Sequence, residues 1–198
     1  MDEPRILLTN DDGIDSVGFR ALYEGLSTLG EVVAVAPADD QSSVGRSISH
    51  EVDIREHDLG YVVEGTPVDC VVAGLGTLCP DVDLVVSGCN KGANIGAYVL
   101  GRSGTVSAAV EAAFFEVPAI SVSLYIDGGG KDWEQLATDT EDFRHATAAA
   151  SYLVDHAHKA GVFEAADYLN VNVPFVADSA VDEPTEMVVT HPSTRYEM

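Results

Sequence analysis

Apolar residues in this chain fall into short unbroken runs, and most of these runs stop at a glycine, a proline or a polar cluster. Runs of this kind, bounded by turn-forming residues, are typical of strands buried in a parallel sheet. Residues 5–9 stop at Asn-Asp-Asp-Gly, and residues 31–36 stop at a proline. The predicted strands are residues 5–9, 31–36, 61–64, 84–87, 119–124 and 168–173.

Between the strands, apolar residues recur at helical spacing. Phe19, Leu22 and Leu26 fall on one face of a helix, and Gly30 follows as a stop signal. The predicted helices are residues 19–29, 68–75, 103–115 and 140–159. Strands that alternate with helices predict an α/β fold with a doubly wound, mostly parallel sheet. We expect residues 1–198 to form a single domain, with no linker or repeat.

Four polar segments follow predicted strands or open the next helix, at residues 9–13, 36–45, 87–96 and 102–105. Ligands of doubly wound sheets bind beyond the carboxyl ends of the strands. Because these ends meet at one edge, the architecture would bring together two carboxylates, a serine, asparagines and a helix start. That combination suits metal-assisted phosphoryl transfer.

Asp11 and Asp12 are the strongest candidates in this set. Two adjacent carboxylates at a strand end raise each other's pKa unless a cation neutralises them, and aspartate oxygens suit hard divalent metals. The alternative is structural, because Asn-Asp-Asp-Gly is also good turn chemistry and aspartate often caps a helix.

The other three segments have similar alternatives. Residues 36–45 could be a solvated loop, and the glycines of residues 87–96 could form a plain turn. Ser103 could be an ordinary helix cap, although a helix start with two hydroxyl groups also favours phosphate. Neither a dinucleotide fingerprint nor a P-loop sequence is present.

Charge is the unusual part of the composition. The chain has 33 acidic and 10 basic residues, for a formal net charge of −23. This charge disfavours a polynucleotide partner and indicates a protein that works in concentrated salt, as halophile proteins do. A small anionic substrate would then need a local positive device, such as a metal or a helix N-terminus.

The cysteines and the apolar runs bear on location. Cys70, Cys79 and Cys89 show no Cys-x-x-Cys spacing, and no apolar stretch approaches the ~20 residues that span a bilayer. We therefore expect a cytoplasmic protein without membrane association.

Five ordered segments resemble the SurE (survival protein E) family of 5′/3′-nucleotidases. They read ILLTNDDGIDSVGFRAL, VVAVAPADDQSSVGRSIS, EGTPVDCV, DLVVSGCNKGANIG and SGTVSAAVEAAFFEVPAISVSL. The resemblance covers the core motifs at residues 5–124, whereas residues 125–198 are less typical. It implies a Rossmann-like, three-layer α/β/α fold and the hydrolysis of nucleoside 5′(3′)-monophosphates to nucleoside and phosphate. It further implies one divalent cation per subunit, Mg or Mn, and a homodimer or homotetramer.

The resemblance also implies roles for single residues. The catalytic pair would be Asp11 and Asp12, either of which could help activate water. The same pair, with Ser42 and Asn90, would bind the metal. Phosphate and substrate binding would fall to Asn10, Asn94, Ser103, Gly104 and Thr105. The chain departs from the family pattern at Ser43, where glycine is usual, and around residues 97–102.

Two other functions compete with this hypothesis. A phosphatase with an aspartyl-phosphate intermediate would need Asp-x-Asp after the first strand, whereas this chain has Asp11-Asp12. A nucleotide-binding sensor with weakened catalysis would explain the altered residues 97–102.

Overall fold

The computed structural model describes residues 3–126, 135–176 and 186–195. Within these ranges a seven-stranded sheet has the order β3-β4-β2-β1-β5-β6-β7, and only the β3–β4 pair is antiparallel. The strands are β1 (Arg5–Thr9), β2 (Glu31–Pro37), β3 (Ile54–His57), β4 (Gly60–Val63), β5 (Leu84–Lys91), β6 (Ala119–Tyr125) and β7 (Tyr168–Pro174).

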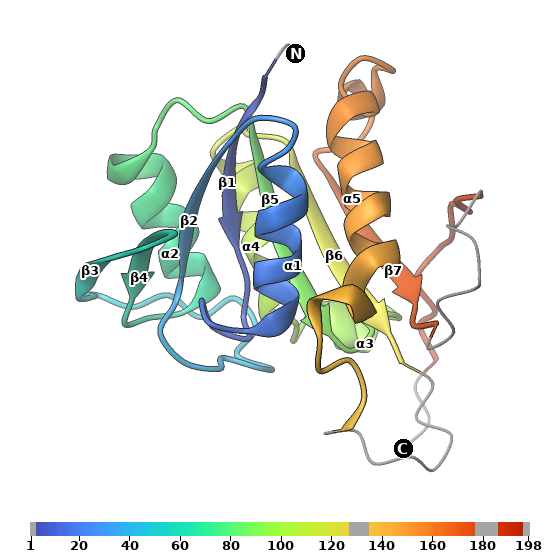
Figure 1. Ribbon diagram of the computed structural model, residues 1–198, viewed down its shortest axis with the longest axis horizontal. Helices are drawn as coiled ribbons and strands as arrows, with labels where there is room; N and C mark the ends of the chain where they lie inside the picture. Colours follow the sequence, from blue (N-terminus) through green and yellow to red (C-terminus); the bar gives the residue numbers. More distant parts are fainter. Residues whose placement is uncertain (1–2, 127–134, 177–185, 196–198) are drawn as a thin grey trace.

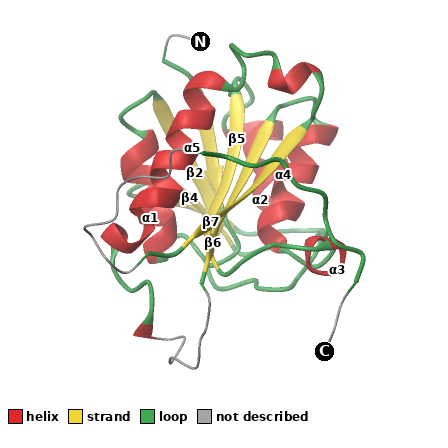
Figure 2. Cartoon of the chain, turned by 90° about the vertical axis from the view of Figure 1, so that its right-hand side faces the viewer, coloured by secondary structure: helices red, strands yellow, loops and turns green. Residues whose placement is uncertain are grey.

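Helices cover both faces of the sheet (Figures 1 and 2). One face carries α1 (Val17–Leu26) and α5 (Arg144–His156), and the other carries α2 (Pro67–Ala73) and α4 (Gly104–Phe114). Shorter elements are the turn of helix α3 (Ala97–Leu100), the π-helical η1 (Gly74–Leu78) and the 3-10 turns η3 (Thr140–Phe143) and η4 (Val162–Glu164). The three-layer, doubly wound α/β fold predicted from the sequence is therefore confirmed.

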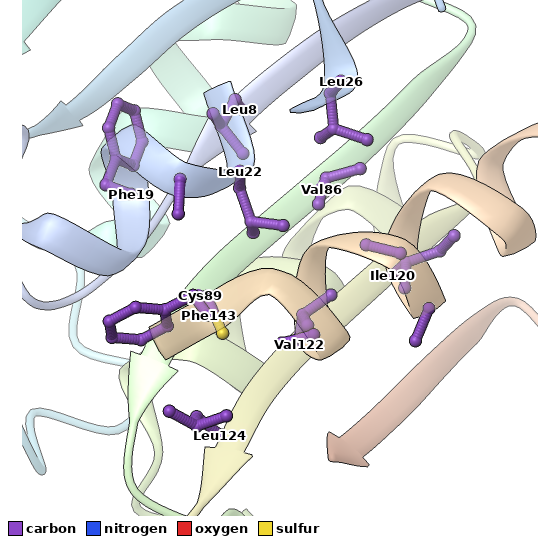
Figure 3. Packing of buried hydrophobic residues seen from close by; sticks show 14 of the residues in the cluster. Leu8, Phe19, Leu22, Leu26, Val86, Cys89, Ile120, Val122, Leu124 and Phe143 are labelled. Carbon is purple, nitrogen blue, oxygen red and sulfur yellow. The ribbon is translucent and has the colours of Figure 1, made fainter. Parts of the chain in front are cut away.

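The core between the sheet and the α1–α5 layer is built from large aliphatic and aromatic side chains (Figure 3). Phe19, Leu22 and Leu26 of α1 are fully buried, because apolar residues at spacings of three and four fall on one helix face. They pack in one cluster with Val86 of β5 and Ile120 of β6.

The core under α4 differs in character. Its helix residues are the small Ala108, Ala109 and Ala112, all fully buried, so the helix backbone can lie close to the sheet. Towards the carboxyl ends of the strands this face becomes polar. A row of paired residues runs across four strands there: Thr9, Ser87, Ser121 and Asn170.

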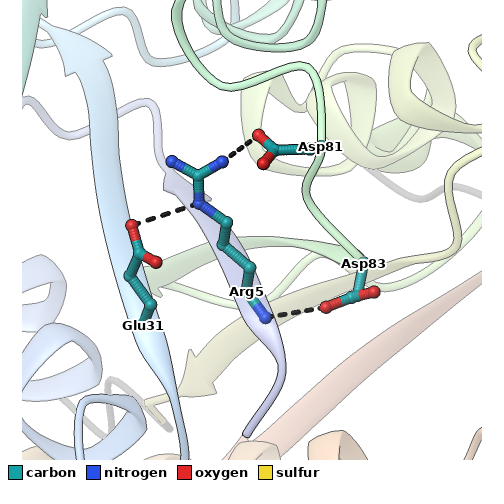
Figure 4. Close-up of polar contacts among 4 residues, drawn as sticks. All are labelled: Arg5, Glu31, Asp81 and Asp83. Carbon is teal, nitrogen blue, oxygen red and sulfur yellow. Dashed lines mark hydrogen bonds and ion pairs between the residues drawn. The ribbon is translucent and has the colours of Figure 1, made fainter.

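Arg5 ties the strands together at the end of the sheet opposite the loop after β1 (Figure 4). Its guanidinium pairs with Glu31 of β2 at 3.1 Å and with Asp81, and its backbone N–H donates to Asp83 at 2.8 Å. Two carboxylates thus share the Arg5 guanidinium at the start of the sheet, and a third bonds to the Arg5 main chain. The contact is partly exposed, so we assign it a role in local charge neutralisation rather than a large share of stability.

The boundaries of several elements differ from the sequence-based prediction. The predicted end of the fourth strand at residue 87 was wrong, because β5 continues through a register shift between Ser87 and Asn90 into the glycine-rich segment. The predicted helix at 140–159 begins as the 3-10 turn η3, where Asp139 and Asp142 form a capping box. The strand β3 and the turn α3 were not predicted. In the described ranges, none of the helices has the length and apolarity needed to cross a membrane.

Candidate active site

The turn after β1 is fixed by the first of the predicted site residues. Asn10 is fully buried, and its Nδ2 donates to the carbonyl of Gly13 at 2.8 Å and to Oγ of Ser16 at 2.9 Å. Both bonds close the turn that leads into α1. Its Oδ1 is buried without a hydrogen-bond partner among the described residues. Asn10 therefore shapes the turn that carries the two aspartates.

Asp11 lies against the N-terminus of α4. Its Oδ1 accepts a 2.6 Å hydrogen bond from Oγ1 of Thr105, and the Thr105 backbone N–H also bonds to this carboxyl group. A helix N-terminus favours negative charge, so this placement suits a carboxylate. The approach is close at Gly104, where an added Cβ would meet Cβ of Asp11 at 2.7 Å. Only glycine allows this contact without displacing Asp11.

Asp12 is less buried than Asp11 and faces β5. Its Oδ2 accepts a 3.2 Å hydrogen bond from the backbone N–H of Lys91. Burial and the neighbouring charge of Asp11 raise the pKa of Asp12 to about 7. Burial also raises the pKa of Asp11, although the hydrogen bonds from Thr105 oppose that rise. The two carboxylates are thus held side by side in a place that disfavours two uncompensated negative charges.

The loop after β2 reaches the same place. The backbone N–H of Gln41 donates to the carbonyl oxygen of Asp11 at 2.7 Å, and the charge of Asp40 further raises the pKa of both aspartates. Ser42 follows directly and is exposed, and its N–H donates to Oδ1 of Asp40 at 2.7 Å. Farther along, Gly45 donates to the carbonyl of Arg102, which joins this loop to the residues before α4.

The segment after Ser87 contributes two asparagines. Asn90 lies at the end of β5, beside the Lys91 that bonds to Asp12, and its Nδ2 donates to the carbonyl of Gly92 at 2.5 Å. Asn94 is buried, and its Nδ2 donates to Oγ1 of Thr105 at 3.3 Å and to Oγ of Ser123 at 2.9 Å. The structure therefore connects Asn94 to Asp11 through one hydroxyl group.

Ser103 caps α4, as one of the two interpretations of the sequence predicted. Its Oγ accepts from the backbone N–H of Val106 at 3.0 Å. The structure thus brings the predicted Asp11, Asp12, Asn94, Gly104 and Thr105 together at one edge of the sheet. Asn10, Ser42, Asn90 and Ser103 lie in the segments that converge there.

The donor set at this edge fits a hard divalent cation. Within the described ranges, no group of three or more His, Cys, Asp or Glu side chains is arranged to hold a metal ion. A metal at this edge would instead combine the carboxylates of Asp11 and Asp12 with hydroxyl or amide oxygens. Oxygen ligands of this kind are those that Mg²⁺ and Mn²⁺ accept. The raised pKa values of both aspartates mark a place where added positive charge would be favourable.

Sequence reasoning assigned no individual role to four residues that this arrangement uses: Asp40, Ser123, Asn170 and Asn172. Asp40 adds to the negative field on Asp11 and Asp12. The other three contact Asn94. The available signal was the strand sequence YLNVNV, in which asparagines alternate with valines on what should be a buried strand.

Comparison with known proteins identifies the family of this chain. A family model described as Survival protein SurE matches residues 6–198. The chain belongs to the SurE family. A relative named 5′-nucleotidase SurE, from Haloarcula marismortui, is 63% identical over 202 residues, which cover 100% of this chain and 72% of the relative. A relative of the same name from Haloquadratum walsbyi is 61% identical over 194 residues, covering 98% of this chain and 72% of the relative.

The fold comparison gives the same family. The crystal structure of the SurE protein from Aquifex aeolicus matches with a TM-score of 0.75 and 36% sequence identity, and the match covers 87% of this chain and 67% of that one. The SurE resemblance predicted from the sequence motifs is therefore confirmed. The halophilic archaea among the relatives support the halophilic origin that the net charge indicated.

Proposed function

We propose that this SurE chain is a divalent-metal-dependent phosphoric monoester hydrolase that converts nucleoside 5′-monophosphates, and 3′-monophosphates as well, to nucleoside and phosphate. The observation that carries the proposal is the Asp11–Asp12 pair, in which Asp11 lies against the N-terminus of α4 and Asp12 bonds to β5. The names of the relatives, 5′-nucleotidase SurE, support the same activity.

In this proposal Asp11, Asp12, Ser42 and Asn90 hold one Mg²⁺ or Mn²⁺ per subunit. The bound cation would polarise the phosphoryl oxygens and offset charge that develops during displacement by water. Asn94, Ser103, Gly104 and Thr105 border the place where the phosphate would bind, and Asn10 sets the turn. A carboxylate of the Asp11–Asp12 pair accepts the proton of the attacking water.

The site also has to attract an anion to a protein with a formal net charge of −23. A bound divalent cation and the N-terminus of α4 supply local positive potential, which is where we expect the phosphate to dock. We place the protein in the cytoplasm, where its three free cysteines would stay reduced. We propose a homodimer or homotetramer as its assembly.

Phosphate release from a panel of nucleoside 5′- and 3′-monophosphates, in molar KCl with added Mg²⁺ or Mn²⁺, tests the proposal. Asp11→Asn and Asp12→Asn should each lower kcat at least ~100-fold, because each removes a metal-binding carboxylate. Asp15→Asn is the matched control, since Asp15 is exposed and should leave kcat unchanged. Tight nucleotide binding without turnover under all these conditions would favour the sensor and contradict the enzyme.

A further inference from the structure

Two asparagines of the edge strand β7 hold the backbone of Asn94. Oδ1 of Asn172 accepts from the Asn94 N–H at 2.8 Å, and Nδ2 of Asn172 donates to the Asn94 carbonyl at 3.2 Å. Nδ2 of Asn170 donates to the same carbonyl at 2.9 Å. Both polar groups of the Asn94 main chain are therefore bonded to side chains that lie 78 and 76 positions away in sequence.

The sequence of β7 is unusual for a strand, because two asparagines alternate with two valines. Val171 and Val173 face the core of the α1–α5 layer, whereas Asn170 and Asn172 face the α4 side, in register with Ser121 and Ser123 of β6. Asparagine is depleted in strands because its amide competes with the ladder for hydrogen bonds. Two half-buried asparagines at alternate positions of one strand therefore indicate a specific task on that face.

A hydrogen-bond chain leads from these asparagines to the candidate catalytic pair. The Asn94 amide donates to Oγ1 of Thr105, and that hydroxyl donates in turn to Oδ1 of Asp11. The Thr105 hydroxyl thus accepts from Asn94 and gives its single proton to Asp11. Asn94 thereby contacts the group that holds Asp11.

We infer that Asn172, assisted by Asn170, is a positioning residue of the nucleotidase site. It fixes the main chain of Asn94 so that the Asn94 amide and the Thr105 hydroxyl hold Asp11 in place. The inference rests on the proposed function, because it assigns Asn172 a part in the same site. It gives β7 a role that the family motifs at residues 5–124 do not contain.

The test compares Asn172→Ala with Val173→Ala in molar KCl. Asn172 and Val173 are neighbours on β7, and each substitution truncates one side chain. Val173, however, points into the core on the α1–α5 side and does not contact Asn94. We expect Asn172→Ala to lower kcat/KM by about 10- to 100-fold and to weaken Mn²⁺ binding to the metal-free protein, measured by calorimetry, by a similar factor. Val173→Ala should lower the melting temperature and leave both quantities within about two-fold of the unchanged protein.

Asn172→Asp separates the effect of losing a hydrogen bond to Asn94 from the effect of losing side-chain volume. It keeps an acceptor for the Asn94 N–H but replaces the amide donor with an oxygen that faces the Asn94 carbonyl. We expect this nearly isosteric change to impair Mn²⁺ binding and kcat/KM at least as much as Asn172→Ala. It also keeps the test decisive should the alanine variant fold poorly.

Hydrogen exchange gives a readout that does not depend on activity. The Asn94 N–H should lose protection in Asn172→Ala and keep it in Val173→Ala. Unchanged Asn94 protection in Asn172→Ala, together with unchanged Mn²⁺ affinity in both Asn172 variants, would overturn the inference, even in an active enzyme. If the protein without any substitution releases no phosphate, the proposed function is contradicted. The exchange and calorimetric data would still decide the role of Asn172.

Discussion

Thr105 donates a 2.6 Å hydrogen bond to the carboxylate of Asp11, although 94 positions separate the two residues in the sequence. Both groups are buried, so neither can replace this bond with one to bulk water. The contact joins the turn after β1 to the N-terminus of α4, the two parts of the chain on which the proposed chemistry depends. It also makes Thr105 a residue that acts on the metal-binding carboxylate.

Removing the Thr105 hydroxyl should therefore impair metal binding. Thr105→Val keeps the shape of the side chain but removes the hydroxyl donor to Asp11, and we expect kcat/KM to fall by about 10- to 100-fold. Thr105→Ser restores the hydroxyl and should recover most of the activity. Ser107→Ala is a control on the same helix, because Ser107 bonds to the carbonyl of Ser103 and not to Asp11. Equal activity of the valine and serine variants would contradict this role.

Gly104 should not tolerate even one methyl group. In Gly104→Ala the new Cβ would lie 2.7 Å from Cβ of Asp11 and 2.9 Å from its Oδ2, so the carboxylate or the helix must shift. Misplacing a catalytic carboxylate by about 1 Å should lower kcat/KM by about 100-fold. Gly101→Ala is the matched control, since the nearest atom to its added Cβ is 3.8 Å away. Comparable kinetics for the two alanine variants would show that Asp11 is not positioned this closely.

In the metal-free protein, the charge on Asp12 should lower the stability of the fold at neutral pH. Its pKa is raised to about 7 in the folded state, against about 3.9 for an unfolded aspartate. The protonated carboxyl group therefore makes its full contribution to the free energy of unfolding below about pH 4. That contribution is lost as the pH rises through about 7. Asp12→Asn should accordingly melt at a higher temperature than the unchanged protein in chelator, by a margin that grows from about pH 5 to about pH 8.

Saturating Mn²⁺ should reverse that order, because the unchanged protein binds the cation through Asp12 and the variant lacks this ligand. Thermal melts with and without Mn²⁺ over the same pH range measure both effects. A variant that is less stable at every pH in chelator would contradict the raised pKa of Asp12.

Salt should stabilise the fold. With 33 acidic and 10 basic residues, like charges crowd the surface, and ions screen their repulsion. We expect the melting temperature to rise by several degrees between about 0.2 M and about 2 M KCl, whereas sucrose at matched osmolality should give a smaller increase. A melting temperature that is independent of KCl would argue against adaptation to concentrated salt.

The fold could be predicted largely from the sequence because its main signals are local. Buried parallel strands read as apolar runs, and the helices between them carry periodic apolar faces, as in Phe19, Leu22 and Leu26. The exceptions are places where tertiary pairing overrides the local pattern. Residues 54–57 are mostly polar and form β3 because β4 offers an open edge, and residues 88–91 continue β5 despite their glycine.

The site could be predicted only in part. Asp11, Asp12 and Thr105 follow strands or open a helix, so topology alone places them at one edge. The partners of Asn94 were not predictable in this way, because a side-chain bond from Asn172 to a main chain 78 positions away leaves no local pattern. Sequence spacing does not show which way an amide points, and that orientation connects β7 to Asp11.

Metal dependence of phosphate release is the most direct test of the central claim. Metal-free protein in molar KCl and excess chelator should release no phosphate from a nucleoside 5′-monophosphate above background, and Mn²⁺ or Mg²⁺ added beyond the chelator should restore turnover. Asp15→Asn should behave like the unchanged protein, whereas Asp11→Asn should stay inactive with either metal. Full activity in excess chelator would contradict the account.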